Sequence, residues 1–259
     1  MILDDILAAK RREVAQAKER VGISELRAAA EALEPPRDFI GAFAGTDRPY
    51  LLAEIKAASP SAGSIRSGFS PALIAGQYQQ AGAAALSVLT DRPYFGGSLD
   101  DLRHARGAVN LPVLRKEFIL DPFQVYESRA AGSDAILLMA QALEPDDLRA
   151  LLELAHGLGM GALVEGHTAG QIDKAVASGA RLIGINNRDL STFHTDLATT
   201  AERMRQIPAD RLVISQSAIR CRGDVERVAA AGVAGVQVGE ALMRSDDIAA
   251  KVRELLGRG

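Results

Sequence analysis

Short aliphatic runs recur along the chain, and four of them are preceded by a small residue–glycine–small residue element. The element occurs at 81–83, 131–133, 178–180 and 231–233, each time after a stretch with helical spacing of alanine and leucine. Glycine in this position is typical of a helix end, because it adopts the left-handed backbone conformation that ends many helices. The aliphatic run that follows is too short for a helix and is typical of a strand buried on both faces. The pattern therefore predicts repeated helix–strand units.

The four elements lie about 50 residues apart, which leaves room for one further helix–strand unit between neighbours. Matching aliphatic runs start at Leu51, Leu111, Gly161 and Arg211. Eight predicted strands thus alternate with helices, which is typical of a parallel sheet, either doubly wound or closed into a barrel. The even spacing and the lack of a GxGxxG turn favour closure. We predict an α/β protein with a (β/α)8 barrel, the TIM barrel.

Residues 1–48 precede the first predicted strand, and the barrel does not need them. Apolar positions there have helical spacing in two stretches, the first formed by Leu3, Ile6 and Leu7. Pro35 and Pro36 end the second stretch, because proline breaks a helix. We predict an N-terminal helical extension over 1–48 that packs on one end of the barrel, within a single domain over 1–259.

Composition narrows the class of protein. With 259 residues, of which 47% are hydrophobic, the chain suits one large folded domain. Its 30 Lys and Arg residues are balanced by 33 Asp and Glu, so the basic excess typical of nucleic-acid-binding proteins is missing. No apolar run is long enough to cross a membrane, and Asp4 and Asp5 argue against a signal peptide. We expect a cytoplasmic protein whose partners include neither nucleic acid nor a membrane.

Cysteine and histidine give no sign of a metal site. Cys221 is the single cysteine, so neither an internal disulfide nor a Cys-rich zinc site can form. His167 and His194 have no second ligand at metal-binding spacing. We therefore expect no metal.

Polar residues gather at the carboxyl ends of the predicted strands. In a (β/α)8 barrel these ends meet at one face, and that face carries the active site. A single Lys or Glu is usually a solvated surface residue, but independent surface charges would fall at either end of the strands. Mixed charges at a barrel mouth can also shift pKa values toward catalytic use. The predicted cluster comprises Glu54, Lys56, Lys116, Glu165, Asn186, Arg188 and Gln216.

The loops after the last two predicted strands indicate an anion site. The seventh strand runs into Gln216, Ser217 and Ala218, and the eighth ends in Gly239 and Glu240. Loops in these positions, with a helix N-terminus behind them, form the usual phosphate site of the barrel. Together with the lysines they predict a phosphorylated small-molecule ligand.

Several motifs occur together in a characteristic order. They are AEIKAASPS at 53–61, LPVLRKEF at 111–118, GINNRDL at 184–190 and VGEALM at 238–243. Their combination and spacing resemble the indole-3-glycerol phosphate synthase family over nearly the whole chain. The resemblance implies a carboxy-lyase of tryptophan biosynthesis that closes the indole ring of 1-(2-carboxyphenylamino)-1-deoxyribulose 5-phosphate. Carbon dioxide and water are lost, and no metal or organic cofactor is implied.

The motif match also implies roles for individual residues. Lys116 matches the general acid that protonates the ketone oxygen, and Lys56 matches a lysine that contacts substrate and assists proton transfer. Glu54 and Glu165 match the acidic pair that serves as base and acid at the dehydration step. The other matches are Asn186, which orients catalytic groups, a substrate pocket of Ser59, Phe118, Arg188, Gln216 and Ser217, and a phosphate cradle of Lys56, Ala218, Gly239 and Glu240.

The chain departs from the usual family pattern at six positions. These are Gln216 for glutamate, Ala218 for glycine, Glu117 for aspartate, Gly166 for valine, and Ala57 and Ala62 for basic residues. Gln216 removes a charge from the site, and Ala218 costs about 1 kcal/mol if the backbone there requires a positive φ. The principal lysines are intact, as are Glu54, Glu165 and Asn186.

Three functions stay open at this point. The first, which we expect, is an active synthase. The second is a paralogue or engineered variant of the same barrel, with altered or lost activity on a related phosphorylated ligand. The third is a non-catalytic barrel that binds a phosphate ligand. We expect the chain to be a monomer.

Overall fold

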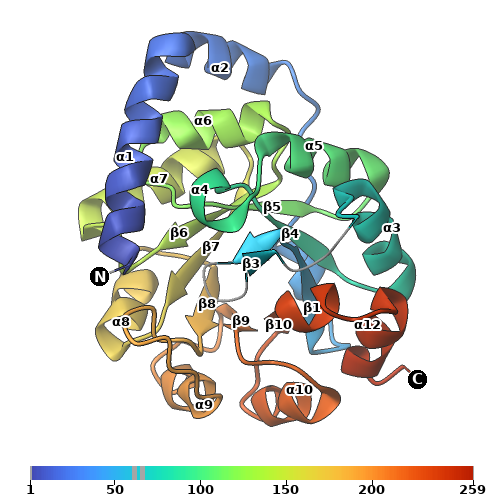
Figure 1. Cartoon of the computed structure of the whole chain (residues 1–259). Helices are drawn as coiled ribbons and strands as arrows, with labels where there is room; N and C mark the ends of the chain where they lie inside the picture. Colours follow the sequence, from blue (N-terminus) through green and yellow to red (C-terminus); the bar gives the residue numbers. More distant parts are fainter. Residues whose placement is uncertain (1, 60–62, 65–67, 259) are drawn as a thin grey trace.

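A computed structural model describes residues 2–59, 63–64 and 68–258 (Figure 1). Eight parallel strands close into a barrel in chain order, which confirms the predicted fold. The strands are β1 (Tyr50–Ile55), β4 (Ala85–Leu89), β5 (Val113–Lys116), β6 (Ala135–Met139), β7 (Gly161–Gly166), β8 (Leu182–Asn186), β9 (Leu212–Gln216) and β10 (Gly235–Val238). The two short strands β2 (Ala58–Ser59) and β3 (Gly63–Ser64), which the pattern did not predict, form an antiparallel pair after β1.

Helices follow the barrel strands and surround them (Figure 1). Gly82, Gly132, Gly179 and Gly232, the glycines of the repeated element, have φ between 86° and 99°, so the predicted left-handed helix ends are confirmed. The helices after β1 are α3 (Pro71–Ala81), α4 (Arg92–Phe95), α5 (Leu99–Ala108), α6 (Pro122–Ala130), α7 (Pro145–Gly157), α8 (Ala169–Ala177), α9 (Ala198–Met204), α10 (Arg222–Ala229), α11 (Glu240–Met243) and α12 (Ile248–Leu256). No helix in the described part of the chain is long and apolar enough to cross a membrane.

The N-terminal extension reaches both ends of the barrel. Its helices are α1 (Ile2–Arg20) and α2 (Ile23–Glu31), followed by the 3-10 helix η1 (Gly41–Phe43). Phe39 packs against Gly161 and Phe43 against Gly235, so both rings cover the amino ends of the strands. Lys10 of α1 instead contacts loops at the carboxyl ends. Packing on one end alone was therefore a wrong prediction. The first helix contacts the carboxyl-end loops, α2 packs along α6, and the segment after α2 reaches the amino ends.

Candidate active site

The alternation of side chains along each strand brings the polar residues together. Leu52, Leu114, Leu163 and Ile214 point into the barrel, where they form one apolar cluster with the rings of the extension. Side chains two residues further along a strand point to the same interior. They occupy the next layer toward the carboxyl ends, and they are Glu54, Lys116, Glu165 and Gln216. The predicted convergence at one mouth is present in the structure.

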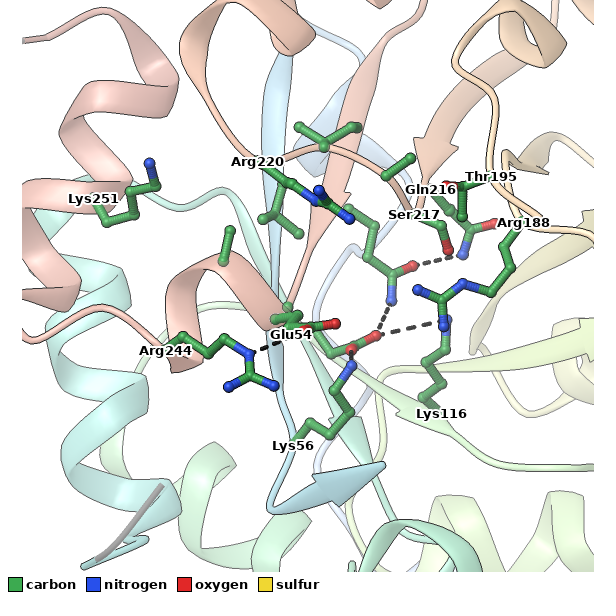
Figure 2. Close-up of a pocket in the computed structure, with 17 residues that line it drawn as sticks. Glu54, Lys56, Lys116, Arg188, Thr195, Gln216, Ser217, Arg220, Arg244 and Lys251 are labelled. Atoms are coloured by element: carbon green, nitrogen blue, oxygen red, sulfur yellow. Dashed lines mark hydrogen bonds and ion pairs between the residues drawn. The ribbon is translucent and has the colours of Figure 1, made fainter. Parts of the chain in front are cut away.

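Two lysines and two carboxylates form the centre of the mouth, and Figure 2 shows three of them, Glu54, Lys56 and Lys116. Lys56 Nζ lies 2.9 Å from Glu54 Oε1. Lys116 Nζ lies 3.7 Å from Glu54 Oε2 and 3.6 Å from Glu165 Oε2, so it stands between the carboxylates. Asn186 Nδ2 donates to Glu165 Oε1 at 3.0 Å. Glu165 Oε2 accepts no hydrogen bond within the described part of the chain, so it is available as a proton acceptor.

Glu54 stays ionised despite its burial. Burial alone would raise its pKa, but the ammonium groups of Lys56 and Lys116 outweigh this effect and lower the pKa to about 2. This value lies below the usual 4.5, so the interaction stabilises the folded state at neutral pH, and the stabilisation is lost as the pH falls through about 2. Glu54 is therefore suited to be an anion that orients the two lysines, and not a neutral acid.

A chain of amide hydrogen bonds holds Glu54 from the other side. Gln216 Nε2 donates to Gln237 Oε1 at 2.6 Å, and Gln237 Nε2 donates to Glu54 Oε2 at 2.7 Å. Gln237 was not predicted as a site residue, although a polar residue inside the strand run GVQV is a usable signal. Gln216 thus has a specific place in this chain of hydrogen bonds, because its amide donates to Gln237. A carboxylate at position 216 could only accept, so Gln237 would have to turn its own donor away from Glu54.

A cavity of about 580 Å³ lies at the carboxyl ends of β9 and β10. Its wall includes the predicted Lys56, Arg188, Ser217, Ala218, Gly239 and Glu240. Figure 2 also shows Arg220, Arg244 and Lys251 around it, three cations that were not predicted. Arg220 lies after β9, Arg244 directly follows α11, and Lys251 lies on α12, where the sequence carries no strand pattern that assigns a direction to a side chain. Positive groups outnumber the two lining carboxylates, so the cavity suits a phosphate.

A smaller, more apolar cavity of about 140 Å³ adjoins the first. Phe95 and Phe118 face it with ring centroids 6.2 Å apart, and its apolar wall is completed by Leu89, Leu137, Met139 and Leu190. Phe118 was predicted to line the pocket, whereas Phe95 was not. Both cavities are lined by the same central residues, which are Glu54, Lys56, Lys116, Arg188 and Ser217. A ligand with one anionic end and one aromatic end would span the two.

The substituted positions fit this geometry. The backbone φ is 67° at Ser217 and 63° at Ala218, which confirms that position 218 requires the left-handed conformation. Gly166 lets α8 approach, because a Cβ there would lie 3.1 Å from Gln171 Cβ. Ala57 is half-buried. Ser59 is described by its backbone in β2 only, and Ala62 lies outside the described residues.

We expect Ala218→Gly to raise the free energy of unfolding by about 0.5–1 kcal/mol, because the left-handed conformation costs alanine more than glycine loses in chain entropy. Chemical denaturation measures this change. The control is Ala15→Gly in the exposed middle of α1, where glycine is expected to destabilise by about 1 kcal/mol. Equal destabilisation by both substitutions would contradict the strain at position 218.

Comparisons with known proteins show the family of the chain. A family model described as indole-3-glycerol phosphate synthase matches residues 3–255. The chain belongs to the indole-3-glycerol phosphate synthase family. The indole-3-glycerol phosphate synthase of Rhodopirellula baltica is 48% identical over 255 residues, which are 98% of this chain and 98% of the relative. That of Albidiferax ferrireducens is 47% identical over 257 residues, covering 98% of this chain and 97% of the relative.

Solved structures of lower identity show the fold of this synthase-family chain. A mandelate oxidase mutant has a TM-score of 0.64 at 17% identity, covering 91% of this chain and 84% of its own. A 3-hexulose-6-phosphate synthase has a TM-score of 0.60 at 16% identity, covering 81% of this chain and 99% of its own. At such identities the likeness concerns the barrel alone.

Proposed function

We propose that the barrel mouth closes the indole ring of 1-(2-carboxyphenylamino)-1-deoxyribulose 5-phosphate, giving indole-3-glycerol phosphate, carbon dioxide and water. The observation that carries this proposal is the position of Lys116 between Glu54 and Glu165, where a cationic cavity and an aromatic cavity meet. Membership of the family supports the same reaction. The chain is accordingly a decarboxylating carbon–carbon lyase.

The substrate is expected to span both cavities. Its phosphate would lie in the larger one, between Lys56 Nζ and the backbone of Ala218, Gly239 and Glu240. Its carboxyphenyl ring would lie in the smaller one, against the pair formed by Phe95 and Phe118. Fixing both ends brings the reacting carbons together and removes part of the entropic barrier.

Ring closure requires an acid at the ketone. The ring carbon that bears the carboxylate attacks the ketone carbon, and the Lys116 ammonium donates a proton to the ketone oxygen as the new C–C bond forms. Loss of carbon dioxide then returns an electron pair to the ring. Glu54 and Glu165 pair with Lys116 Nζ and aim it at the site of reaction.

Dehydration requires an acid for the leaving hydroxyl and a base for the proton that is lost on aromatisation. Glu165 is suited to be the base, because Asn186 holds one of its oxygens and the other accepts no hydrogen bond among the described residues. Lys56 is suited to donate the proton to the departing hydroxyl, because Glu54 holds its ammonium group at the mouth. Arg188 and Ser217 line both cavities and are suited to orient the substrate.

The test is to mix the protein with the carboxyphenylamino deoxyribulose phosphate and to follow the absorbance of the indole product. Formation of indole-3-glycerol phosphate supports the proposal. Folded protein that gives no product at any accessible pH would end it. Activity that appears only after Gln216→Glu with Ala218→Gly would favour a paralogue with lost turnover, and substrate binding without turnover in either protein would favour a non-catalytic barrel.

We further expect the chain to work in the cytoplasm as a monomer and without nucleic acid. The near balance of 30 basic and 33 acidic residues supports the last point.

A further inference from the structure

Lys10 is a buried cation that lies outside the reaction centre. It belongs to α1, and only 5% of the residue is exposed. Its Nζ lies 2.7 Å from Glu13 Oε2, 2.9 Å from Asp91 Oδ1 and 3.0 Å from Glu117 Oε1. We call these four residues the Lys10 cluster. Asp91 and Glu117 are also buried, so this cation is surrounded by carboxylates with little access to water.

The two buried carboxylates of the Lys10 cluster belong to neighbouring loops of the mouth. Asp91 follows β4 and caps α4, where its Oδ2 accepts from Tyr94 N at 2.9 Å. Phe95 is the last residue of that one-turn helix. Glu117 follows Lys116 directly, and its Oε1 accepts from Phe118 N at 2.9 Å. A single ammonium group of the extension therefore joins the two loops that carry the aromatic walls.

The charges in the Lys10 cluster depend on one another. Burial lowers the pKa of Lys10, but Glu117, Glu13 and Asp91 outweigh this effect and raise the pKa above its usual value, so Lys10 stays charged. For Asp91, burial raises the pKa, and Lys10 opposes the rise. Removing a partner from a buried ion pair leaves an uncompensated charge, which is strongly unfavourable. Without Lys10, Glu117 would keep Arg115 Nη2 at 3.7 Å and the Thr90 hydroxyl at 2.8 Å, so the uncompensated charge would be that of Asp91. Asp91 would turn away from Glu117, and the β4–α4 loop that it caps would be displaced.

We propose that Lys10 is a positioning residue that holds the β4–α4 and β5–α6 loops together and so fixes the Phe95–Phe118 pair, against which the substrate ring binds. The assignment of the ring to the surface of this pair rests on the proposed function. The link between the loops stands on the contacts of the Lys10 cluster. Lys116, Glu54 and Glu165 have ion pairs of their own, so the chemical step depends less on Lys10 than ring binding does.

The experiment compares Lys10→Met with Lys18→Met in steady-state turnover of the carboxyphenylamino deoxyribulose phosphate. For Lys10→Met we expect KM to rise about tenfold, because the aromatic walls are no longer fixed, while kcat changes by less than about threefold. Lys18 is the matched control, because it also joins α1 to the barrel, through a more exposed pair with Asp121 at 2.6 Å. A purely structural role would reduce the fraction of folded enzyme and hence kcat, and would leave KM unchanged.

A second readout does not require turnover. Hydrogen–deuterium exchange followed by mass spectrometry should show faster exchange at 92–98 and 117–120 in Lys10→Met, with the strands of the barrel unchanged. If Lys10→Met does not fold, Asp91→Asn replaces it, because asparagine retains the helix cap and removes the charge that faces Lys10. Its KM should rise in the same direction. Unchanged KM and unchanged exchange in both loops would overturn the proposal. If the wild type is inactive but the variant still shows faster exchange in these loops, only the proposed function is contradicted.

Discussion

Lys116→Met is expected to lower kcat by about 10²–10⁴-fold, the range typical of losing a general acid. Methionine retains an unbranched side chain of similar reach, so the pocket keeps its shape while the ammonium group is lost. The physical reason lies in the position of Nζ, 3.7 Å from Glu54 Oε2 and 3.6 Å from Glu165 Oε2. No other lysine of the described residues pairs with both carboxylates. Steady-state turnover of the carboxyphenylamino deoxyribulose phosphate measures the effect.

Lys116→Arg separates proton donation from charge. Arginine supplies a cation at the same place, but it does not release its proton in the range of ordinary catalysis. We therefore expect Lys116→Arg to bind substrate with a KM close to that of the wild type. Its kcat should fall by most of the factor that Lys116→Met loses. Lys18 pairs with Asp121 at the start of α6, and neither residue lines the two cavities, so Lys18→Met should retain full activity. A Lys116→Met protein with a kcat within about tenfold of the wild type would exclude Lys116 as the acid.

The barrel and its principal site residues were predictable for one physical reason. A strand alternates its side chains with a period of two, so a buried aliphatic such as Leu114 implies that Lys116, two residues on, faces the same interior. Parallel strands also end at one face, which makes separate strand ends neighbours. Glu54, Lys116 and Glu165 followed from local sequence and this topology alone.

The features that were not predicted depend on contacts between distant segments. Lys10 and Glu117 lie 107 positions apart in sequence, yet their atoms are 3.0 Å apart, and no periodicity links them. Gln237 was overlooked because its function is to hold Glu54, a residue of the adjoining strand. Phe95 enters the site through a one-turn helix whose direction is set by Asp91 and not by a hydrophobic pattern.

Gly239→Ala is expected to lower kcat/KM by about 100-fold, through displacement of Glu54. The φ of Gly239 is −125°, so alanine is not strained by its backbone. Its Cβ, however, would lie 2.3 Å from Glu54 Oε1, the atom that pairs with Lys56. Glu54 cannot easily retreat, because Gln237 holds its other oxygen at 2.7 Å. The added methyl group therefore disturbs the lysine–carboxylate centre and the backbone expected to bind phosphate. Steady-state turnover of the same substrate measures the loss.

A matched glycine distinguishes this effect from the mere addition of a methyl group. At Gly170 in α8 a Cβ would meet nothing within 4 Å, so Gly170→Ala should leave kcat/KM unchanged and raise the stability of the helix by up to about 1 kcal/mol. Combining Gly239→Ala with Glu54→Asp should recover part of the lost kcat/KM, because the shorter carboxylate leaves room for the new methyl group. If the loss of kcat/KM in the double variant instead equalled the product of the two single losses, the two positions would act independently. The steric argument would then be wrong.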